Sequence, residues 1–279
     1  MTITTPPAPQ SPQAPPQGPR GSARVIAILA ITLGVVLIAG TVVLGVLSSA
    51  RGGGASGSGE LTADATGIRS LDVDVAAADL TVVFSGDEVQ LDVTGNVDDW
   101  RLTRDEDSLR VSTSRSWWGS WGLFDQADRA VLTLPASLES TALDAEFSLS
   151  AGHLRADGRF DDLDIDLSAG DIDVSGSARN LDADVSAGRL VLDLDSVDEA
   201  DIHLSAGNVA GALTGTAPTE IGIDVSAGRL DLTIPDETYA VRSDVSAGTF
   251  DNGLRVDAGS RNTITVSVSA GFAGLRAAR

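Results

Sequence analysis

The 279-residue chain contains no cysteine and no lysine, and only 4% of its residues are aromatic. Without cysteine it can form neither a disulfide nor a thiolate metal site. All 19 basic residues are therefore arginines, and they stand against 40 acidic residues, which gives a net charge of −21. Nucleic acids and anionic lipid headgroups both require a basic protein face. We therefore expect no nucleic-acid partner.

The first sixty residues are expected to lie outside the folded domain. Residues 1–24 contain seven of the ten prolines and show no apolar periodicity, which predicts a disordered Pro-rich tail. Residues 25–47 are apolar and uncharged throughout, and at ~1.5 Å per residue they are long enough to cross a hydrocarbon core of ~30 Å. This predicts one transmembrane helix. Residues 48–60 are rich in glycine and serine and are expected to form a flexible linker.

A cleaved signal peptide is the alternative interpretation of residues 25–47, because small residues follow at 48–50. The apolar run is much longer than the ~7–15 residues of a signal-peptide core, which favours an uncleaved anchor. Arg20 and Arg24 precede the span, so the positive-inside rule places the N-terminus in the cytoplasm. The expected location is the cell membrane, single-pass, with residues 61–279 as an extracytoplasmic domain.

That domain repeats the phrase Ser-Ala-Gly seven times. The serines are separated by 18, 18, 19, 21, 20 and 23 residues, and a degenerate copy puts Ala76 in the serine position. Periods near 20 residues indicate a solenoid. The expected corner residues are Ser150, Gly152, Ser168, Gly170, Ser186, Gly188, Ser205, Gly207, Ser226, Gly228, Ser246, Gly248, Ser269 and Gly271.

Apolar residues alternate with polar ones before each corner, as in Leu181, Ala183 and Val185. A period of two predicts strands with one buried face, and among the repeats only Ser243 breaks the pattern. After the corner the apolar residues change parity, so one extra residue must be accommodated there. Gly188 can adopt the positive φ that such a bend requires. We expect Ala187 inside the corner and the Ser186 hydroxyl bonded to backbone or to a neighbouring serine.

These features predict an all-β fold, a single-stranded parallel β-helix of about eight coils, counting the degenerate copy. The crossover rule favours a right-handed turn. A β-sandwich is the alternative, and the constant column register makes it less suitable.

Three segments, GIRSLDVDVAAADLTV, DSLRVSTS and VLTLPASLESTALDAEFSLSAG, together with the Ser-Ala-Gly repeats, resemble the bacterial putative-adhesin family. Its members are envelope proteins with a β-strand-repeat domain of unknown function. The resemblance covers about residues 61–279. It implies a right-handed β-helix displayed at the cell envelope, with no catalytic motif to carry over.

An outward column of aspartates includes Asp166, Asp184, Asp224 and Asp244, interrupted by His203. Solvent screening and nearby arginines are the ordinary compensation for such a column, and bridging Ca²⁺ is the alternative because hard cations collect several oxygens. The acidic pairs recur at every repeat, and His153 and His203 have no metal-ligand spacing. We expect no enzyme activity and no cofactor.

Residues 81–140 interrupt the repeat with further expected strands, including a hairpin with its tip near residues 105–107. An aromatic segment follows, with Trp117, Trp118, Trp121 and Phe124. It is expected to cover an end or side of the solenoid, and the alternative is a binding patch for a glycan, a partner or the membrane interface. The expected function is adhesion or contact with an unknown envelope protein, and the alternative is a carbohydrate-binding or carbohydrate-active protein that uses these side chains.

Overall fold

The computed structural model describes residues 57–114 and 128–278, all within the unit Ser48–Arg279. The expected tail, the expected membrane span and most of the linker lie outside these residues, and so does the aromatic segment with Trp117, Trp118, Trp121 and Phe124. In the described part of the chain, no helix is long and apolar enough to cross a membrane.

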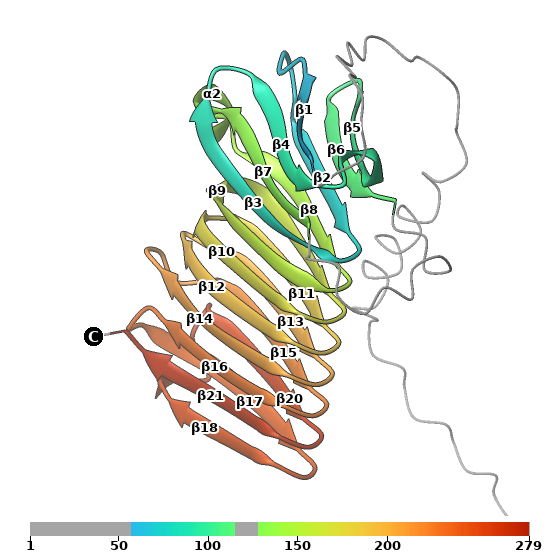
Figure 1. The fold of residues 1–279 in the computed structure, drawn as a ribbon. Helices are drawn as coiled ribbons and strands as arrows, with labels where there is room; N and C mark the ends of the chain where they lie inside the picture. Colours follow the sequence, from blue (N-terminus) through green and yellow to red (C-terminus); the bar gives the residue numbers. More distant parts are fainter. Residues whose placement is uncertain (1–56, 115–127, 279) are drawn as a thin grey trace, which may run out of the picture. The chain divides into compact units, whose positions relative to one another are not determined.

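The described residues are nearly all β (Figure 1). The strands are β1 (Gly57–Ala63), β2 (Ser70–Val75), β3 (Ala78–Gly86), β4 (Val89–Gly95), β5 (Trp100–Asp105), β6 (Ser108–Thr113), β7 (Asp128–Pro135), β8 (Leu143–Leu149), β9 (Gly152–Leu167), β10 (Asp171–Ser177), β11 (Asn180–Val185), β12 (Arg189–Asp195), β13 (Glu199–Leu204), β14 (Asn208–Thr214), β15 (Glu220–Val225), β16 (Arg229–Ile234), β17 (Thr238–Val245), β18 (Thr249–Gly253), β19 (Arg255–Val256), β20 (Thr263–Val268) and β21 (Phe272–Ala277). A 3₁₀ turn, η3 (Val97–Asp99), and a short helix, α2 (Ala136–Glu139), complete the described elements. Because β1 begins at Gly57, residues 57–60 belong to the sheet rather than to the expected linker.

Most strands belong to two parallel sheets, which gives a β-helix-like fold. We call one strand of sheet B, the corner after it and the following strand of sheet A a coil. Each inner coil pairs with the coils on either side of it. In sheet B, β11 pairs in parallel with β9 and β13, and in sheet A, β12 pairs in parallel with β10 and β14. The long strand β9 serves both sheets, because its first half pairs with β10 and its second half with β11.

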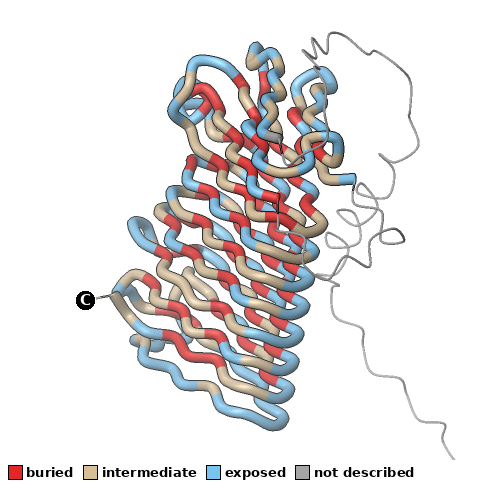
Figure 2. The backbone as a smooth tube through the Cα atoms, in the orientation of Figure 1, coloured by how far each residue is buried: buried red, intermediate tan, exposed pale blue. Residues whose placement is uncertain are grey.

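The core lies between the two sheets and follows the predicted alternation. Leu181, Ala183 and Val185 before the corner are buried, and so are Leu190, Leu192 and Leu194 after it. The same pattern continues through the inner coils, where buried and outward positions alternate along every strand (Figure 2). The coil of β17 and β18 is the exception, because Ser243, Val245 and Asn252 at inward positions are exposed.

The corner glycines are required by the stacking, as the change of parity predicted. Gly188 has a φ of 122°, and a Cβ there would approach the carbonyl oxygen of Gly170 in the neighbouring coil to 2.3 Å. The positive φ and this close approach both exclude a side chain. At the degenerate copy the glycine position is held by Ala78, which does not have a positive φ and opposes Gly152 in the register.

Two expectations about the corner are wrong. Ala187 is exposed rather than inside the bend. The Ser186 hydroxyl has no hydrogen-bond partner among the described residues, and the corner is instead held by backbone bonds between coils. The amide of Ser186 donates to the Leu167 carbonyl at 2.8 Å, and the amide of Ala187 donates to the Ser168 carbonyl at 3.0 Å. Once each coil bonds through its backbone, side chains at the corner can point to solvent.

The last two coils do not stack in the order in which the chain makes them. The coil of β20 and β21 lies between the coil of β15 and β16 and the coil of β17 and β18. The final repeat is therefore an inner coil, and the preceding repeat forms the C-terminal end of the stack, at the bottom of Figure 1. The order of these coils in the stack therefore differs from their order along the chain.

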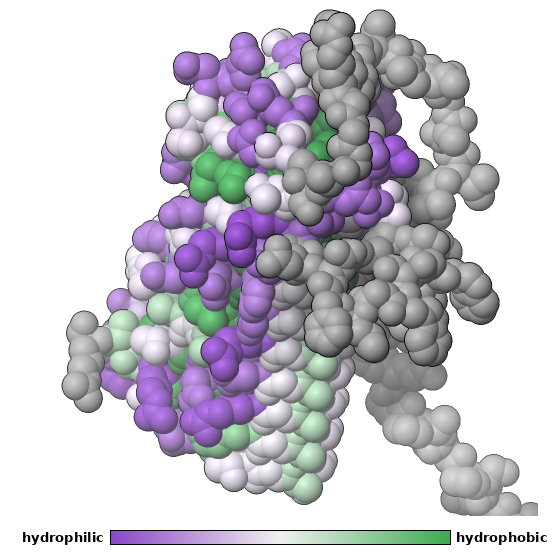
Figure 3. All heavy atoms as spheres, in the orientation of Figure 1, coloured by the Kyte–Doolittle hydropathy of each residue, from purple (hydrophilic) through white to green (hydrophobic). Residues whose placement is uncertain are grey.

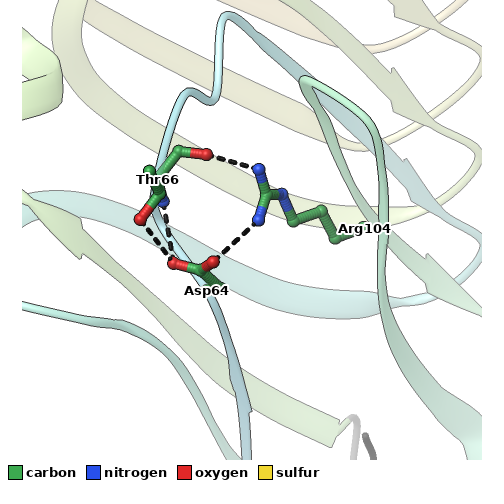
Figure 4. Close-up of polar contacts among 3 residues, drawn as sticks. All are labelled: Asp64, Thr66 and Arg104. Atoms are coloured by element: carbon green, nitrogen blue, oxygen red, sulfur yellow. Dashed lines mark hydrogen bonds and ion pairs between the residues drawn. The ribbon is translucent and has the colours of Figure 1, made fainter. Parts of the chain in front are cut away.

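Antiparallel strands form the other end. In sheet A, β7 pairs antiparallel with β4, and β4 with β1, while in sheet B, β6 pairs antiparallel with β5. The expected hairpin with its tip near residues 105–107 is confirmed as β5–β6, with Glu106 at a φ of 50°. The Arg104 guanidinium from this hairpin bonds to the Asp64 carboxylate at 3.0 Å and to the Thr66 carbonyl, which ties β5 to the turn after β1 (Figure 4).

Candidate interaction surface

Sheet B carries a concentration of carboxylates on its outer side, and we call these outward side chains the acidic face. They come from strand positions that alternate with buried residues, so the pleat alone directs them away from the core. The acidic members along the inner coils are Asp72, Asp74, Asp144, Glu146, Asp162, Asp164, Asp166, Asp182, Asp184, Glu199, Asp201, Glu220 and Asp224.

The parallel register places these carboxylates in columns. Four residues before the corner serine, Glu146 pairs with Asp164, Asp164 with Asp182, and Asp182 with Asp201. Neighbouring strands in a sheet lie about 4.8 Å apart. Like charges at that spacing repel, so this column raises the energy of its own fully ionised state.

The pKa values of several carboxyl groups on this face are raised, first by burial and then by neighbouring charges. Partial burial, followed by the charges of Asp182 and Glu146, raises the pKa of Asp164 to about 6. Partial burial and Asp184 raise the pKa of Asp166, while burial and then Asp184 and Asp201 raise that of Asp182. For Glu146 the pKa is raised by burial first and then by Asp72 and Asp166. Glu146, Asp164, Asp166 and Asp182 therefore hold protons more tightly than isolated carboxyl groups do.

Few cations compensate this face within the described residues. Arg110 of β6 bonds to Asp72 at 2.9 Å and lies 3.5 Å from Asp74, at the N-terminal end of the columns. Further along, no salt bridge in the described residues reaches Asp164, Asp166, Asp182 or Asp184. A cationic partner would find these carboxylates available.

The outer side of sheet A is different, because arginines and a histidine are interleaved with its aspartates. Arg155 bonds to Asp173 at 2.9 Å, and His153 lies 3.2 Å from Asp171 on the neighbouring coil. Arg229 bonds to Asp231 at 2.6 Å and also lies over the Phe272 ring, 4.2 Å from its centroid. Charge is balanced locally on this side, so the acidity of the molecule is expressed mainly on sheet B.

The structure brings together only some of the aspartates in the alternative calcium ladder. Asp166 and Asp184 are register neighbours, and His203 opposes Asp184 on the next coil and Asp224 on its other side. Ser267 lies between Asp224 and Asp244, because the final repeat is inserted there. The structure thus brings Asp166 and Asp184 together and separates the other two from each other. Within the described ranges, no group of three or more acidic or histidine side chains is arranged to hold a metal ion.

The corner residues form a second surface, along the edge where sheet B turns into sheet A. The corner serines are exposed and follow one another from coil to coil in the order Ser168, Ser186, Ser205, Ser226, Ser269 and Ser246. Figure 3 shows small residues of near-neutral hydropathy as a straight ladder down the lower right edge. The ladder consists of Ser, Ala and Gly and carries no charge, so it offers no site for ionic recognition.

The column predicted from the sequence lies two residues before the corner, and the acidic residues four residues before it form a second column. The second column contains Glu146, Asp164 and Asp182, and it includes the one carboxyl group whose pKa is raised as far as about 6. The signal was present, because Glu146, Asp164 and Asp182 recur at the same 18-residue spacing as the corner serines. The pairing of Arg110 with Asp72 gave no such signal, since it depends on β6 lying beside β2.

Comparisons with known proteins give the following result. No protein-family model matches the chain, and no curated protein matches it. Among solved structures, a putative cell adhesion protein from Clostridium sporogenes is similar over 80% of this chain and 99% of its own, with 10% identity and a TM-score of 0.37. A putative adhesin from Bacteroides fragilis covers 80% of this chain and 98% of its own, with 12% identity and a TM-score of 0.38. A putative adhesin from Parabacteroides distasonis covers the same shares, with 12% identity and a TM-score of 0.30. The names of these structures agree with the family that the sequence resembles.

Proposed function

We propose that this chain is a non-catalytic cell-envelope protein that uses the acidic face of sheet B to hold a positively charged envelope component, in adhesion or in assembly of the envelope. Residues 25–47 would anchor it as a single-pass membrane protein, with the N-terminus in the cytoplasm and the β domain outside. The proposal includes a right-handed solenoid of about eight coils, as the sequence predicts.

One observation carries this proposal, which is the contrast between the two outer surfaces. On sheet A, Asp173 is bonded to Arg155 and Asp231 to Arg229. On sheet B, Asp164 and Asp182 face each other across neighbouring coils, and both pKa values are raised. A cationic partner would reduce the repulsion between these carboxylates, and this reduction would contribute to the free energy of binding. The partner that fits is an arginine- or lysine-rich protein segment, or another polycation of the envelope.

The test is capture of partners by the full, membrane-anchored chain on intact cells, using crosslinking at the cell surface followed by purification. The test variant neutralises the acidic column, with Glu146→Gln, Asp164→Asn and Asp182→Asn combined. The matched control neutralises three aspartates on sheet A, with Asp171→Asn, Asp173→Asn and Asp231→Asn. We expect a basic partner that is captured by the wild-type chain and by the control, and that is lost at least tenfold with the test variant.

Equal capture by both triple variants would contradict the proposal, and so would the capture of glycans alone. The carbohydrate alternative is measured separately on a glycan array. Binding by the full chain that disappears in the variant Trp117→Ala with Trp118→Ala, while the acidic-column variant binds normally, would replace the proposed function.

A further inference from the structure

The C-terminal end of the stack has an open strand edge. Among the described residues, β17 pairs along one edge with β20, and on its other edge only Thr238 and Tyr239 are paired, with β19. The amide of Ala240 donates to the Asn262 carbonyl and that of Ser246 to the Val268 carbonyl, so the even-numbered residues point toward β20. Backbone groups alternate in direction along a strand. The amides and carbonyls of Val241, Ser243 and Val245 therefore point out of the open edge.

The side chains at this end are unusually exposed for inward positions. Val245 is 41% exposed, although its register equivalents in inner coils, Val225 and Val268, are buried. Val256 of β19, at the same end, is 57% exposed. In Figure 2 the lowest coil is almost entirely pale blue, whereas the coils above it alternate with red. An apolar rim beside unpaired backbone groups is typical of an edge that accepts another strand.

The charges on this edge are self-complementary. The open stretch reads Val241, Arg242, Ser243, Asp244, Val245, and Arg242 and Asp244 point outward on either side of Ser243. Neither charged side chain forms an ion pair with another described residue. When such a strand runs antiparallel to a copy of itself, each arginine faces an aspartate and each valine faces a valine. An edge with charges of one sign would instead repel its copy.

We infer that the chain forms a two-fold symmetric dimer through β17, with the strand of one copy running antiparallel to the same strand of a second copy and Ser243 opposite Ser243. Val241, Ser243 and Val245 are then the hydrogen-bonded positions, because their backbone groups already point outward. Arg242 and Asp244 occupy the non-bonded positions, where side chains approach most closely. The same register therefore satisfies the backbone hydrogen bonds and the charge pairs, and β17 need not rearrange to form it.

A second copy suits this edge better than an unrelated strand. The pairing uses the same five residues on both sides, as a two-fold symmetric interface requires, and it consumes the open part of the β17 edge in both copies. The polar Ser243 at an inward position also limits the apolar surface left exposed in the monomer. This residue is the single break in the apolar pattern before the corners.

The absence of native cysteine allows a direct test in the full chain, solubilised in a mild detergent. Opposed residues of a hydrogen-bonded antiparallel pair have Cα atoms about 5.5 Å apart, within the range that a disulfide spans. Ser243→Cys should therefore form covalent dimers under mild oxidation. The matched control is Ser226→Cys, an exposed corner residue of an inner coil, which should stay monomeric. Equal dimer yields from the two variants would overturn the inference.

Charge reversal tests the pairing without cysteine, by sedimentation velocity over a concentration series. Arg242→Asp alone and Asp244→Arg alone should each weaken self-association at least tenfold, and the double variant should restore it because the pairs are exchanged. A mixture of the two single variants should form heterodimers, since each then faces its complement. Circular dichroism checks that the variants are folded. The inference would be overturned if the wild-type chain remained monomeric over a 100-fold range of concentration that reaches its solubility limit. It would also be overturned if dimers formed equally well in all of these variants.

Discussion

The two ends of the solenoid are finished in different ways. At the N-terminal end, the strands β4, β1 and β5 are added by antiparallel pairing. The Arg104 guanidinium joins the hairpin β5–β6 to Asp64 and Thr66. At the C-terminal end the parallel coil of β17 and β18 is itself the last layer, with Val245 exposed. A solenoid buries each repeat only against its neighbours, so each end needs its own means of stopping. One end is stopped by a change of strand direction, and the other by polar substitution at inward positions such as Ser243 and Asn252.

The largest effect is expected from truncation after Val256, because the C-terminal sequence fills an inner layer. The deleted strands β20 and β21 bury Ile264, Val266 and Leu275 between the adjacent coils. We expect the free energy of unfolding to fall by more than about 5 kcal/mol. Hydrogen exchange should also show loss of protection in β17 and β18, measured beside urea unfolding.

Truncation after Ala278 is the control, because it leaves β21 whole. If β17 kept its full protection from hydrogen exchange in the chain truncated after Val256, the stacking order of the last coils would be contradicted, because β17 pairs with β20 in this structure.

Corner glycines should be far less replaceable than a glycine at the N-terminal end. Gly188→Ala places a Cβ 2.3 Å from the Gly170 carbonyl oxygen at a φ of 122°, and we expect a loss of about 2–4 kcal/mol. Gly67→Ala is the matched control, because its φ of 75° is also positive but no atom lies within 4 Å of the added carbon. That variant should lose about 1 kcal/mol. Similar losses in thermal or urea unfolding would show that stacking contacts do not set the requirement.

The acidic face between the two ends should make stability fall as the pH rises. Burial, then Asp182 and Glu146, raise the pKa of Asp164 from 3.8 to about 6, so the folded chain binds this proton more tightly than the unfolded chain. The resulting stabilisation is present below about pH 4 and is lost as the pH rises through about 6. Asp164→Asn removes the cost of ionisation and should add about 1 kcal/mol at pH 7.5, after allowing for solvent screening.

The gain from Asp164→Asn should be clearly smaller at pH 4.5, which urea unfolding at the two pH values would measure. Asp173→Asn on sheet A is the control and should give no gain at pH 7.5, because it loses the bond to Arg155. A gain for Asp164→Asn that is equal at both pH values would contradict the electrostatic explanation.

The smallest effect is expected at the N-terminal end, and with the opposite sign. The backbone amide and hydroxyl of Thr66, followed by Arg104, hold the pKa of Asp64 below its ordinary value. The stabilisation from this group is present above that ordinary value and is lost as the pH falls. Asp64→Asn should therefore reduce hydrogen-exchange protection around the turn after β1 at neutral pH and make no difference in strong acid. Asp87→Asn, in an exposed turn, should change neither. The same loss at both pH values would show that the carboxylate charge is not involved.

Local features of the fold could be predicted because their causes are local. Alternation in Leu181, Ala183 and Val185 specifies a strand with one buried face, and the parity change at Gly188 specifies the bend. The aspartates of the acidic face follow from the same alternation, so Asp166 and Asp184 were correctly placed as neighbours. The exposed position of Ala187 was missed, because the sequence does not show which side of the bend faces the interior.

Stacking order was decided only by the tertiary structure. Seven coils carry the same Ser-Ala-Gly corner, and nearly all share the same apolar alternation. Many different pairs of coils could therefore stack in register, and the repeat does not specify which coils become neighbours. Insertion of the final repeat brought Ser267 between Asp224 and Asp244, and it left the coil of β17 and β18 at the end of the stack. The sequence by itself therefore determined the strands, the corners and the acidic columns, whereas long-range packing decided which layer ends the stack and which carboxylates meet.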